Sequence, residues 1–182
     1  MGWIRSKPVY TTLAPMAGAG RHIFVSMGKP GARAVGRALP GLTDFIHLHA
    51  GEGVQETAEK LRSVDFLLVR LREVLRNSPA STVLCVAGPE HDVWLCCRVG
   101  RECGMTRDRI LAELAGSAAR TVYCVHCKAL TPGVTTSIFP CTGCGQTLFV
   151  RDHFSRLMAA YAGVRVDAEV PGEVPEPEEL YA

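Results

Sequence analysis

The chain has 182 residues, of which 47% are hydrophobic and 21% charged, and its formal net charge is +2. This composition is typical of a globular protein rather than a disordered one, and the length suffices for one ordinary domain plus a small metal-stapled one. Because the chain contains no apolar run of about eighteen residues and no signal-peptide core in its first 20 residues, we expect a cytoplasmic protein that does not cross a membrane.

The charges are unevenly distributed. From Asp167 onward there are six acidic residues and no basic ones, which leaves 20 bases against 12 acids in the rest of the chain, a balance of +8. An acidic tail of this kind either folds back on a basic body or reaches a partner. Since it repels phosphate, nucleic acid is not the expected partner.

The first part of the chain alternates between predicted strands and helices. Residues 1–20 contain prolines and small residues with little periodicity, so we expect a flexible arm. The apolar run 22–26 predicts a buried strand, and residues 32–39 predict a short helix that ends at the following Pro-Gly pair.

A second strand is predicted over residues 44–49. His47 and His49 would share one face of it, because side chains on a strand alternate with a period of two. We expect solvent or backbone partners for both rings. The alternative is a metal site formed together with His22.

The pattern continues as strand and helix up to about residue 118. Apolar residues at three- and four-residue steps predict a long helix over 54–77, followed by a strand over 82–87. A helix over 91–103 and a short helix over 106–114 come next. This succession predicts a small parallel α/β module over residues 21–118.

In parallel α/β sheets, ligands bind beyond the carboxyl ends of the strands. The residues at these ends that we consider as candidates for cofactor binding are Gly28, Gly88 and Pro89, and Gly51 marks the same edge.

Residues 83–114 resemble the closing part of the nicotinamide-nucleotide domain of ferredoxin reductases, in which a strand leads into Cys-Gly-Pro and a helix. Here Ala87 replaces that cysteine, and residues 26–31 lack a G-x-G-x-x-G phosphate loop. The resemblance therefore implies a Rossmann-like module whose nucleotide site is degenerate.

Two Cys-x-x-Cys pairs, 13 residues apart, dominate the last third of the chain: Cys124, Cys127, Cys141 and Cys144. A two-residue gap lets both sulfurs of a pair turn inward from one tight loop, and two such loops form a tetrahedral tetrathiolate site. The alternative is two disulfides, but eight cysteines without a secretory signal indicate a reducing compartment. We therefore predict a rubredoxin-like zinc ribbon over residues 119–166.

The residues leave two alternatives for the metal and three for the role of each of two histidines. Four thiolates suit Zn²⁺ but also hold iron in a rubredoxin-like site, and the short spacer favours zinc. His126 lies inside the first loop and His153 follows the closing strand. Each is an exposed polar residue, a hydrogen-bond donor to a ligand, or a replacement for a cysteine. Helical spacing of apolar residues also predicts a short helix over 155–162.

The series around both cysteine pairs, with Leu148 to Arg156, Gly163-Val164 and the acidic tail, resembles the C-terminal region of the small A subunit of bacterial dimethylamine monooxygenase. The resemblance implies an accessory subunit of an NADPH-dependent enzyme that converts dimethylamine to methylamine and formaldehyde. Haem would then lie on one partner subunit, and FMN with [2Fe–2S] on another. No haem-attachment motif or nucleophile–base pair is visible in the sequence, so we expect no catalytic site on this chain.

The sequence therefore predicts an α/β chain with four parts: the arm, the parallel-sheet module, the zinc ribbon, and a Pro-rich acidic tail over 167–182 that wraps a partner. One competing hypothesis is an independent zinc ribbon that binds nucleic acid or acts in regulation. Residues 121–166 speak against nucleic acid, because they carry four bases and one acid and no aromatic platform. Another is an autonomous NAD(P)H-binding oxidoreductase built on residues 22–115.

Overall fold

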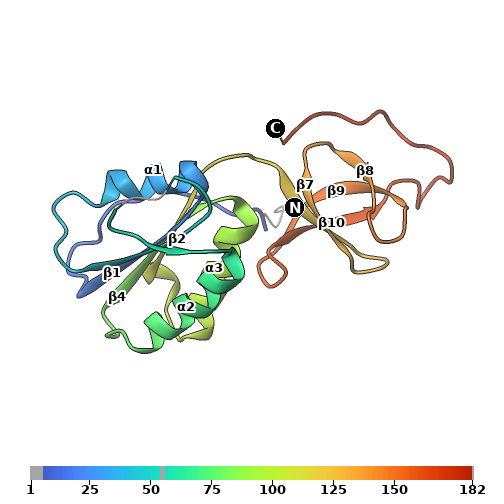
Figure 1. Cartoon of the computed structure of the whole chain (residues 1–182). Helices are drawn as coiled ribbons and strands as arrows, with labels where there is room; N and C mark the ends of the chain where they lie inside the picture. Colours follow the sequence, from blue (N-terminus) through green and yellow to red (C-terminus); the bar gives the residue numbers. More distant parts are fainter. Residues whose placement is uncertain (1–5, 54–55, 182) are drawn as a thin grey trace. The chain divides into compact units, whose positions relative to one another are not determined.

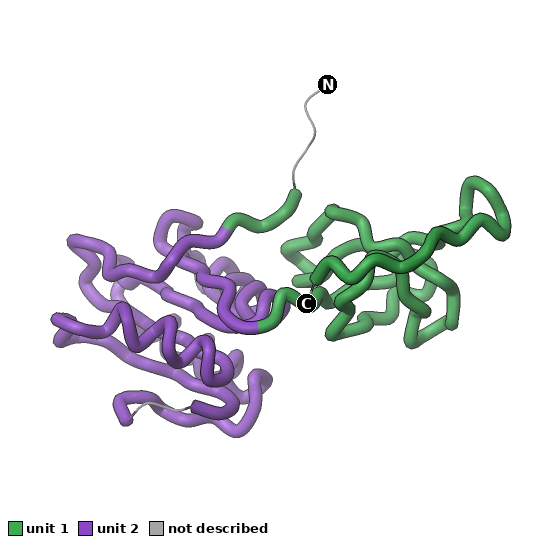
Figure 2. The backbone as a smooth tube through the Cα atoms, turned by 90° about the horizontal axis from the view of Figure 1, so that it is seen from above, with its two compact units in different colours: residues 1–9, 117–182 green, residues 10–116 purple. Residues whose placement is uncertain are grey.

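The computed structural model describes residues 6–53 and 56–181, which divide into two compact units. Tyr10–Gly116 form one unit, here called the α/β module, and the rest of the described chain forms the other, here called the ribbon module (Figure 2). In the described residues, no helix has both the length and the apolar character that a bilayer crossing requires.

The α/β module contains one five-stranded parallel sheet with the strand order β3-β2-β1-β4-β5 (Figure 1). Its elements, in chain order, are β1 (Arg21–Met27), α1 (Gly28–Ala38), β2 (Phe45–Ala50), β3 (Glu59–Leu61), α2 (Val64–Arg76), β4 (Thr82–Gly88), α3 (Glu90–Glu102), the 3-10 turn η1 (Arg107–Arg109) and β5 (Ile110–Leu114). From β1 the chain first adds β2 and β3 on one side, and then returns to add β4 and β5 on the other side of β1. The topological switch point therefore lies between β1 and β4. The predicted α/β class is confirmed.

Helices cover both faces of this sheet, which explains why its central strands are apolar almost throughout. Side chains alternate along β1, so that Ile23 and Val25 pack toward α2 and α3 whereas Phe24 packs against Val35 of α1. The helices α2 and α3 lie side by side on their face. The result is two hydrophobic cores separated by the sheet.

The segment before β1 packs on the sheet instead of forming a flexible arm. The backbone N–H of Thr11 donates to the carbonyl of Ala112 in β5 (3.1 Å), and Leu13 is buried in the same core as Val35. The hydroxyl of Tyr10 donates to Glu90 (2.6 Å). Leu13, Met16 and Ala19 thus cover the α1 face of the sheet near β5, whereas Tyr10 packs on the opposite face against α3. Residues 1–5 of the predicted arm lie outside the described residues.

Two helix predictions in this module are wrong in their extent. The long helix predicted over 54–77 begins only at Val64, where Ser63 caps it by accepting a hydrogen bond from the backbone N–H of Phe66 (3.5 Å). Glu59–Leu61 pair with β2 as an edge strand, and residues 54–55 lie outside the described residues.

The short helix predicted over 106–114 is also wrong. Its first turn is η1, and Ile110–Leu114 extend the sheet beside β4, because hydrogen bonding to a free strand edge outweighs a weak local helix preference.

The ribbon module is a second five-stranded sheet with the order β7-β6-β10-β9-β8. Its strands are β6 (Arg120–Cys124), β7 (Leu130–Val134), β8 (Ile138–Pro140), β9 (Thr147–Ser155) and β10 (Ala160–Arg165). β10 runs parallel to β6, and the other neighbours are antiparallel.

The helix predicted over 155–162 is wrong, because the chain turns after Ser155 and returns as β10. The rings of Phe154 and Tyr161 contact each other across the two strands, with centroids 4.9 Å apart. A helical spacing of apolar residues here reflects a hairpin whose two strands place these rings on one face.

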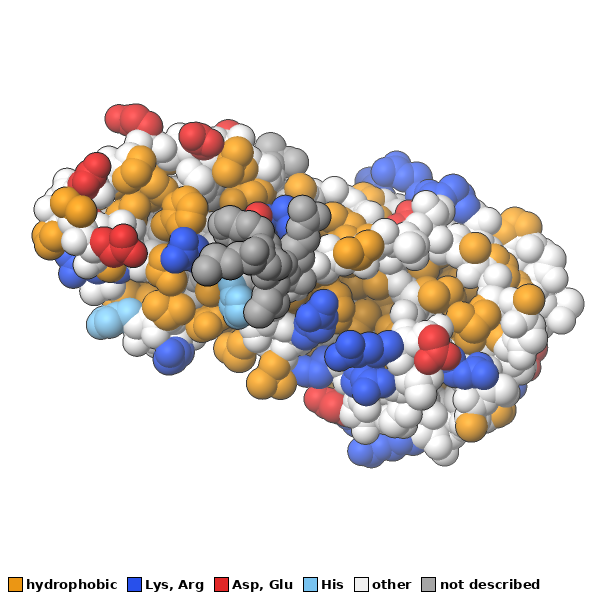
Figure 3. All heavy atoms as spheres, turned by 180° about the vertical axis from the view of Figure 1, so that it is seen from behind, with side chains coloured by type: hydrophobic (Ala, Val, Ile, Leu, Met, Phe, Trp, Pro, Cys, Tyr) orange, Lys and Arg blue, Asp and Glu red, His pale blue; other side chains and the backbone are white. Residues whose placement is uncertain are grey.

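The end of the acidic tail folds back on its own module. The backbone N–H of Ser137 donates to the carbonyl of Glu178 (2.8 Å), and those of Leu180 and Tyr181 donate to the carbonyl of Thr135 (3.0 and 2.9 Å). Of the two sequence alternatives, the structure therefore shows folding back for residues 178–181. On the face drawn in Figure 3, acidic side chains are spread over the ribbon module, and Lys and Arg gather on part of the α/β module.

A buried arginine joins the tail to the sheet. The guanidinium of Arg120 lies between the rings of Tyr161 and Tyr181, 3.9 and 3.8 Å from their centroids, and donates to Asp152 (2.8 Å). Two cation–π contacts and a charge-assisted hydrogen bond thus hold the last described residues in place.

Candidate metal centre

The four cysteines lie on two loops with the same backbone conformation. In the first loop, after β6, the N–H of Lys128 donates to the carbonyl of Cys124 (2.9 Å), and the N–H of Cys124 donates to Ala129 (2.9 Å). In the second, after β8, the N–H of Gly145 donates to Cys141 and the N–H of Cys141 donates to Gln146, both at 2.9 Å. The sequence repeats Cys-x-x-Cys because each pair closes one copy of this loop.

The residue after each pair adopts a left-handed backbone conformation. Gly145 has φ of +70°, which glycine adopts without a steric penalty. Lys128 holds the equivalent position with φ of +66°, and its ammonium group donates to the carbonyl of Val125 (2.7 Å). This hydrogen bond supports the strained residue in the first loop.

The loops bring the four sulfurs together. All four Sγ atoms lie within 4.8 Å of one another, with Cys124 to Cys144 at 3.9 Å and Cys127 to Cys141 at 3.6 Å. A tetrahedral ion with metal–sulfur bonds of about 2.3 Å requires sulfurs about 3.8 Å apart. The cluster therefore fits a tetrahedral tetrathiolate ion and could hold one.

The cysteines are positioned to ionise unequally. A backbone hydrogen bond from Cys144 and another from the N–H of Gly143 (3.4 Å to Sγ) lower the pKa of Cys141 to about 7. The pKa of Cys144 is raised to about 12, because burial and hydrogen bonds with the other three thiols outweigh a backbone hydrogen bond from Gln146 that lowers it. A divalent cation would stabilise all four thiolates together and displace the remaining protons.

Gly143 is packed against the first loop. A Cβ atom at this position would lie 2.5 Å from the Cβ of Ala129 and 3.0 Å from the sulfur of Cys127. Only glycine therefore fits between the loops, and the sequence gives no sign of this constraint beyond the presence of a glycine in the pair.

The two histidines near the cysteines do not join the cluster. His126 and His153 are both exposed, and the metal-binding group found among the described residues consists of the four cysteines. This agrees with the simplest of the three alternatives, an exposed polar side chain.

His22, on β1, does not share a site with His47 and His49 in the described structure. His22 accepts a hydrogen bond from the backbone N–H of Met16 through Nε2 (3.0 Å). The hydroxyl of Ser26, on β1, is 2.8 Å from both Nε2 of His47 and Nδ1 of His49. Sequence reasoning missed Ser26, although it is a polar residue near the carboxyl end of a strand whose centre is apolar.

The weak cofactor candidates lie where the strand order reverses. Gly28 directly follows β1, Gly88 is the last residue of the neighbouring strand β4, and Pro89 precedes α3. Gly28 has φ of +64°, and a Cβ on Gly88 would lie 2.9 Å from the Cβ of Met27. Gly88 is therefore closely packed against Met27, whereas Gly28 is not, and the role of these residues in binding a cofactor stays a prediction.

Comparison with known proteins relates the ribbon module to a family. Residues 121–164, which contain both cysteine pairs, match the family described as "Dimethylamine monooxygenase subunit DmmA-like, C-terminal domain". The ribbon module is a DmmA-like C-terminal domain. In this DmmA-like domain, the family match runs from β6 to β10.

A curated relative extends the similarity beyond the DmmA-like domain. The "Heme-dependent oxidative N-demethylase delta subunit" of Ectopseudomonas mendocina (strain ymp) is 34% identical over 115 residues, or 63% of this chain. The aligned region covers 66% of the relative, which is just under two thirds of its length. No solved structure matches the chain.

Proposed function

We propose that this chain is a non-catalytic, metal-binding subunit of a multi-subunit oxidative N-demethylase. The observation that carries the proposal is the cluster of four sulfurs inside a DmmA-like domain. The name of the relative, a delta subunit of a haem-dependent oxidative N-demethylase, supports the same assignment. The residues able to bind a metal form a closed site, which suits a structural role better than a catalytic one.

We further propose that the ion is Zn²⁺. Cys124, Cys127, Cys141 and Cys144 would each supply one thiolate, so that no coordination position is left for substrate. Bound zinc would link the β6–β7 and β8–β9 loops and stabilise the module, because binding free energy at such a site is folding free energy. Iron is the alternative, since four thiolates also hold iron.

The chemistry is proposed to lie on partner chains. A haem subunit and a reductase subunit with FMN and [2Fe–2S] would together use NADPH to convert dimethylamine to methylamine and formaldehyde. This chain would then contribute a docking surface and the stability of the assembly.

Elemental analysis of the purified assembly tests both parts of this proposal. The chain is co-expressed with its genomic neighbours and isolated through a tag on this chain. We expect one zinc ion per chain, together with partners that contain haem and flavin. Iron in a ratio of one per chain, with the absorption of an iron tetrathiolate, would replace zinc in the proposal. Isolation of the chain with nucleic acid and without a flavin partner would contradict the subunit assignment.

Two cysteine variants separate the metal site from general thiol effects. Cys141→Ser removes a ligand and is expected to abolish stoichiometric metal binding and expose the ribbon module to proteases. Cys103→Ser, at a half-buried cysteine of the α/β module, is the matched control and is expected to retain the metal. If Cys141→Ser keeps both its metal and its protease resistance, the tetrathiolate site is wrong.

A second candidate function is NAD(P)H binding by the α/β module. The observation that favours it is the topological switch point between β1 and β4, the position at which sheets of this kind hold nucleotides. Saturating NADPH is expected to raise the melting temperature of the chain if such a site exists. An unchanged melting temperature would rule this candidate out.

A further inference from the structure

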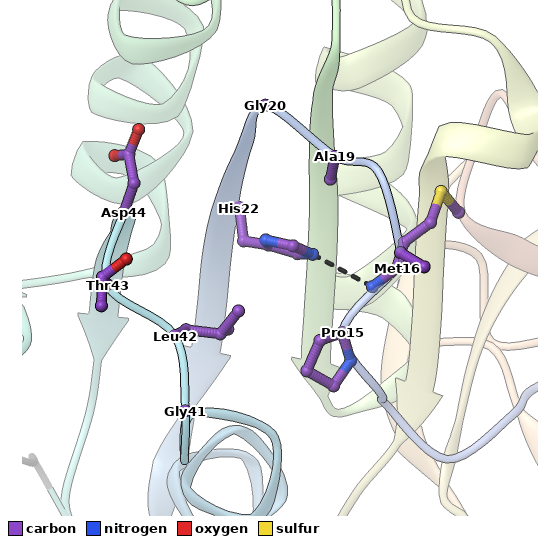
Figure 4. A pocket seen from close by; sticks show the side chains of 10 residues that line it. Pro15, Met16, Ala19, Gly20, His22, Gly41, Leu42, Thr43 and Asp44 are labelled. Carbon is purple, nitrogen blue, oxygen red and sulfur yellow. Dashed lines mark hydrogen bonds between the residues drawn. The ribbon is translucent and has the colours of Figure 1, made fainter.

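A groove lies at the amino-terminal edge of the parallel sheet, opposite the edge that contains the switch point (Figure 4). Its volume is about 540 Å³, within the range of sites that hold small molecules. Three segments line it: residues 15–20 before β1, His22 near the start of β1, and residues 41–44 between α1 and β2. All of them belong to the α/β module, so the groove is contained within one compact unit.

The polar group at the back of the groove is a histidine with a defined tautomer. His22 is only 5% exposed, and its Nε2 atom accepts the hydrogen bond from the backbone N–H of Met16. A nitrogen that accepts carries no proton, so the neutral ring must carry its proton on Nδ1. Burial lowers the pKa of His22, which keeps the ring neutral at pH 7. No hydrogen-bond acceptor for Nδ1 is found in the described part of the chain.

The ring of His22 is held in this orientation. It stacks on the ring of Phe24 with centroids 5.9 Å apart and an angle of 14° between the planes. The Nδ1–H group is therefore a fixed donor and not a freely rotating one. A preoriented donor in a concave site gives directional recognition of an acceptor at a low entropic cost.

The remaining walls are apolar or neutral. Figure 4 shows Leu42 on one side of the imidazole and Pro15 and Met16 on the other. The carboxylate of Asp44, at the rim, is paired with Arg21 (2.9 Å), so that neither charge is left uncompensated. A groove with no net charge and one fixed donor favours an uncharged ligand, because a buried charge would lack a counter-ion.

We propose that this groove binds a small uncharged molecule that has a flat apolar body and one strong hydrogen-bond acceptor, such as a carboxamide or ketone oxygen. The acceptor oxygen takes the Nδ1–H of His22, and the body lies between Leu42 and the pair Pro15 and Met16. The site is independent of the proposed metal-binding role, and it lies at the opposite edge of the sheet from the position where nucleotides bind.

Benzamide and toluene form a matched pair of probes for this site, because they share the ring and differ in the acceptor. The full-length, metal-loaded chain is labelled with ¹⁵N-histidine, and the ring nitrogens are followed by NMR during titration. We expect the unliganded spectrum to show His22 as the Nδ1–H tautomer. Benzamide should shift its Nδ1 resonance saturably, with a dissociation constant of roughly millimolar order, and should bind about fivefold more tightly than toluene.

Two variants complete the test. His22→Phe keeps a stacking ring but removes the donor, and should reduce the preference for benzamide over toluene to about twofold or less. Leu42→Ala, which leaves the ring of His22 unchanged, should weaken benzamide about fivefold. The control is Leu157→Ala, at a side chain of the ribbon module that is 71% exposed, and it should have no effect.

Four results would overturn the proposal. The first is the Nε2–H tautomer for His22, the second is the absence of a saturable shift with benzamide, and the third is equal affinity for benzamide and toluene in the unmodified chain. Unchanged benzamide affinity in Leu42→Ala would place the ligand elsewhere and would overturn the assignment of this groove.

Discussion

Replacing Ser26 by alanine tests a buried series of hydrogen bonds in the α/β module, which joins His47, Ser26 and His49. Nε2 of His49 is 3.2 Å from the carbonyl oxygen of Gly51, which can only accept, so the neutral ring of His49 is protonated on Nε2. Its Nδ1 then accepts from the hydroxyl of Ser26, whose oxygen in turn accepts from Nε2–H of His47. The carbonyl group of Gly51 therefore sets the direction of every hydrogen bond in this series.

Ser26→Ala removes the hydroxyl between the two rings and leaves Nε2 of His47 and Nδ1 of His49 without partners. Ser26 and His49 have no exposed surface and His47 has 2%, so water does not replace the hydroxyl. An unsatisfied buried polar group costs about 1–3 kcal/mol, and two of them should lower the free energy of unfolding by about 4 kcal/mol. Nδ1 of His47 already lacks a hydrogen-bond partner in the described structure, so the variant adds to an existing imbalance.

Urea denaturation followed by the fluorescence of Trp94 measures this loss. Trp94 lies on α3, and its Nε1–H donates to the hydroxyl of Tyr10 (2.8 Å), so it reports on the α/β module. Trp3, the other tryptophan of the chain, is first replaced by phenylalanine. Thr12→Ala, at an exposed residue of the same module, is the control and should change the stability by about 0.5 kcal/mol or less. A loss below about 1 kcal/mol for Ser26→Ala would refute the assigned hydrogen-bond chain.

Three further predictions concern the metal loops, the tail and pH. Gly143→Ala should weaken metal binding about tenfold in a chelator competition, because overpacking costs about 1–3 kcal/mol. Gly145→Asn, at an open position with positive φ that asparagine tolerates, should have little effect, and equal losses in both variants would contradict the packing argument. Tyr181→Ala removes one of the two rings that contact Arg120 and should destabilise the ribbon module by about 1–2 kcal/mol. Tyr181→Phe keeps the ring and should keep the stability. Protease resistance of the module measures both variants. Burial lowers the pKa of His47 to about 4, so the folded state disfavours the protonated ring. The free energy of unfolding of the α/β module should be highest above about pH 6.5 and should fall by about 3 kcal/mol toward pH 4. Urea midpoints that do not change between pH 7 and pH 4 would contradict this assignment.

The helices predicted over 54–77, 106–114 and 155–162 show where local patterns were insufficient. The first contains a true helix, but its amino-terminal part pairs with β2 as a short edge strand. The other two regions contain strands that complete a sheet edge or a hairpin. Apolar residues at three- and four-residue steps predicted the helices over 54–77 and 155–162, and a possible cap at Thr106 predicted the one over 106–114. In each case hydrogen bonding to another strand decided the outcome.

The cluster of four cysteines was more predictable than the secondary structure around it. A Cys-x-x-Cys pair is a local loop whose ligands are close in sequence, so the type and number of ligands can be read directly. The close contact between Gly143 and Cys127 could not be read in this way, because it joins two loops that meet only in the folded module.

The sequence alone determined the α/β class, the four candidate ligands and the presence of an acidic tail, because each depends on composition or on spacing within a few residues. The tertiary structure decided that the tail ends beside Arg120, that residues 13–19 cover part of one face of the parallel sheet, and that Ser26 connects His47 to His49. These contacts join residues on different strands or at opposite ends of a module. Each forms only when its module has folded, since the burial of apolar surface, and not any local preference, brings such residues together.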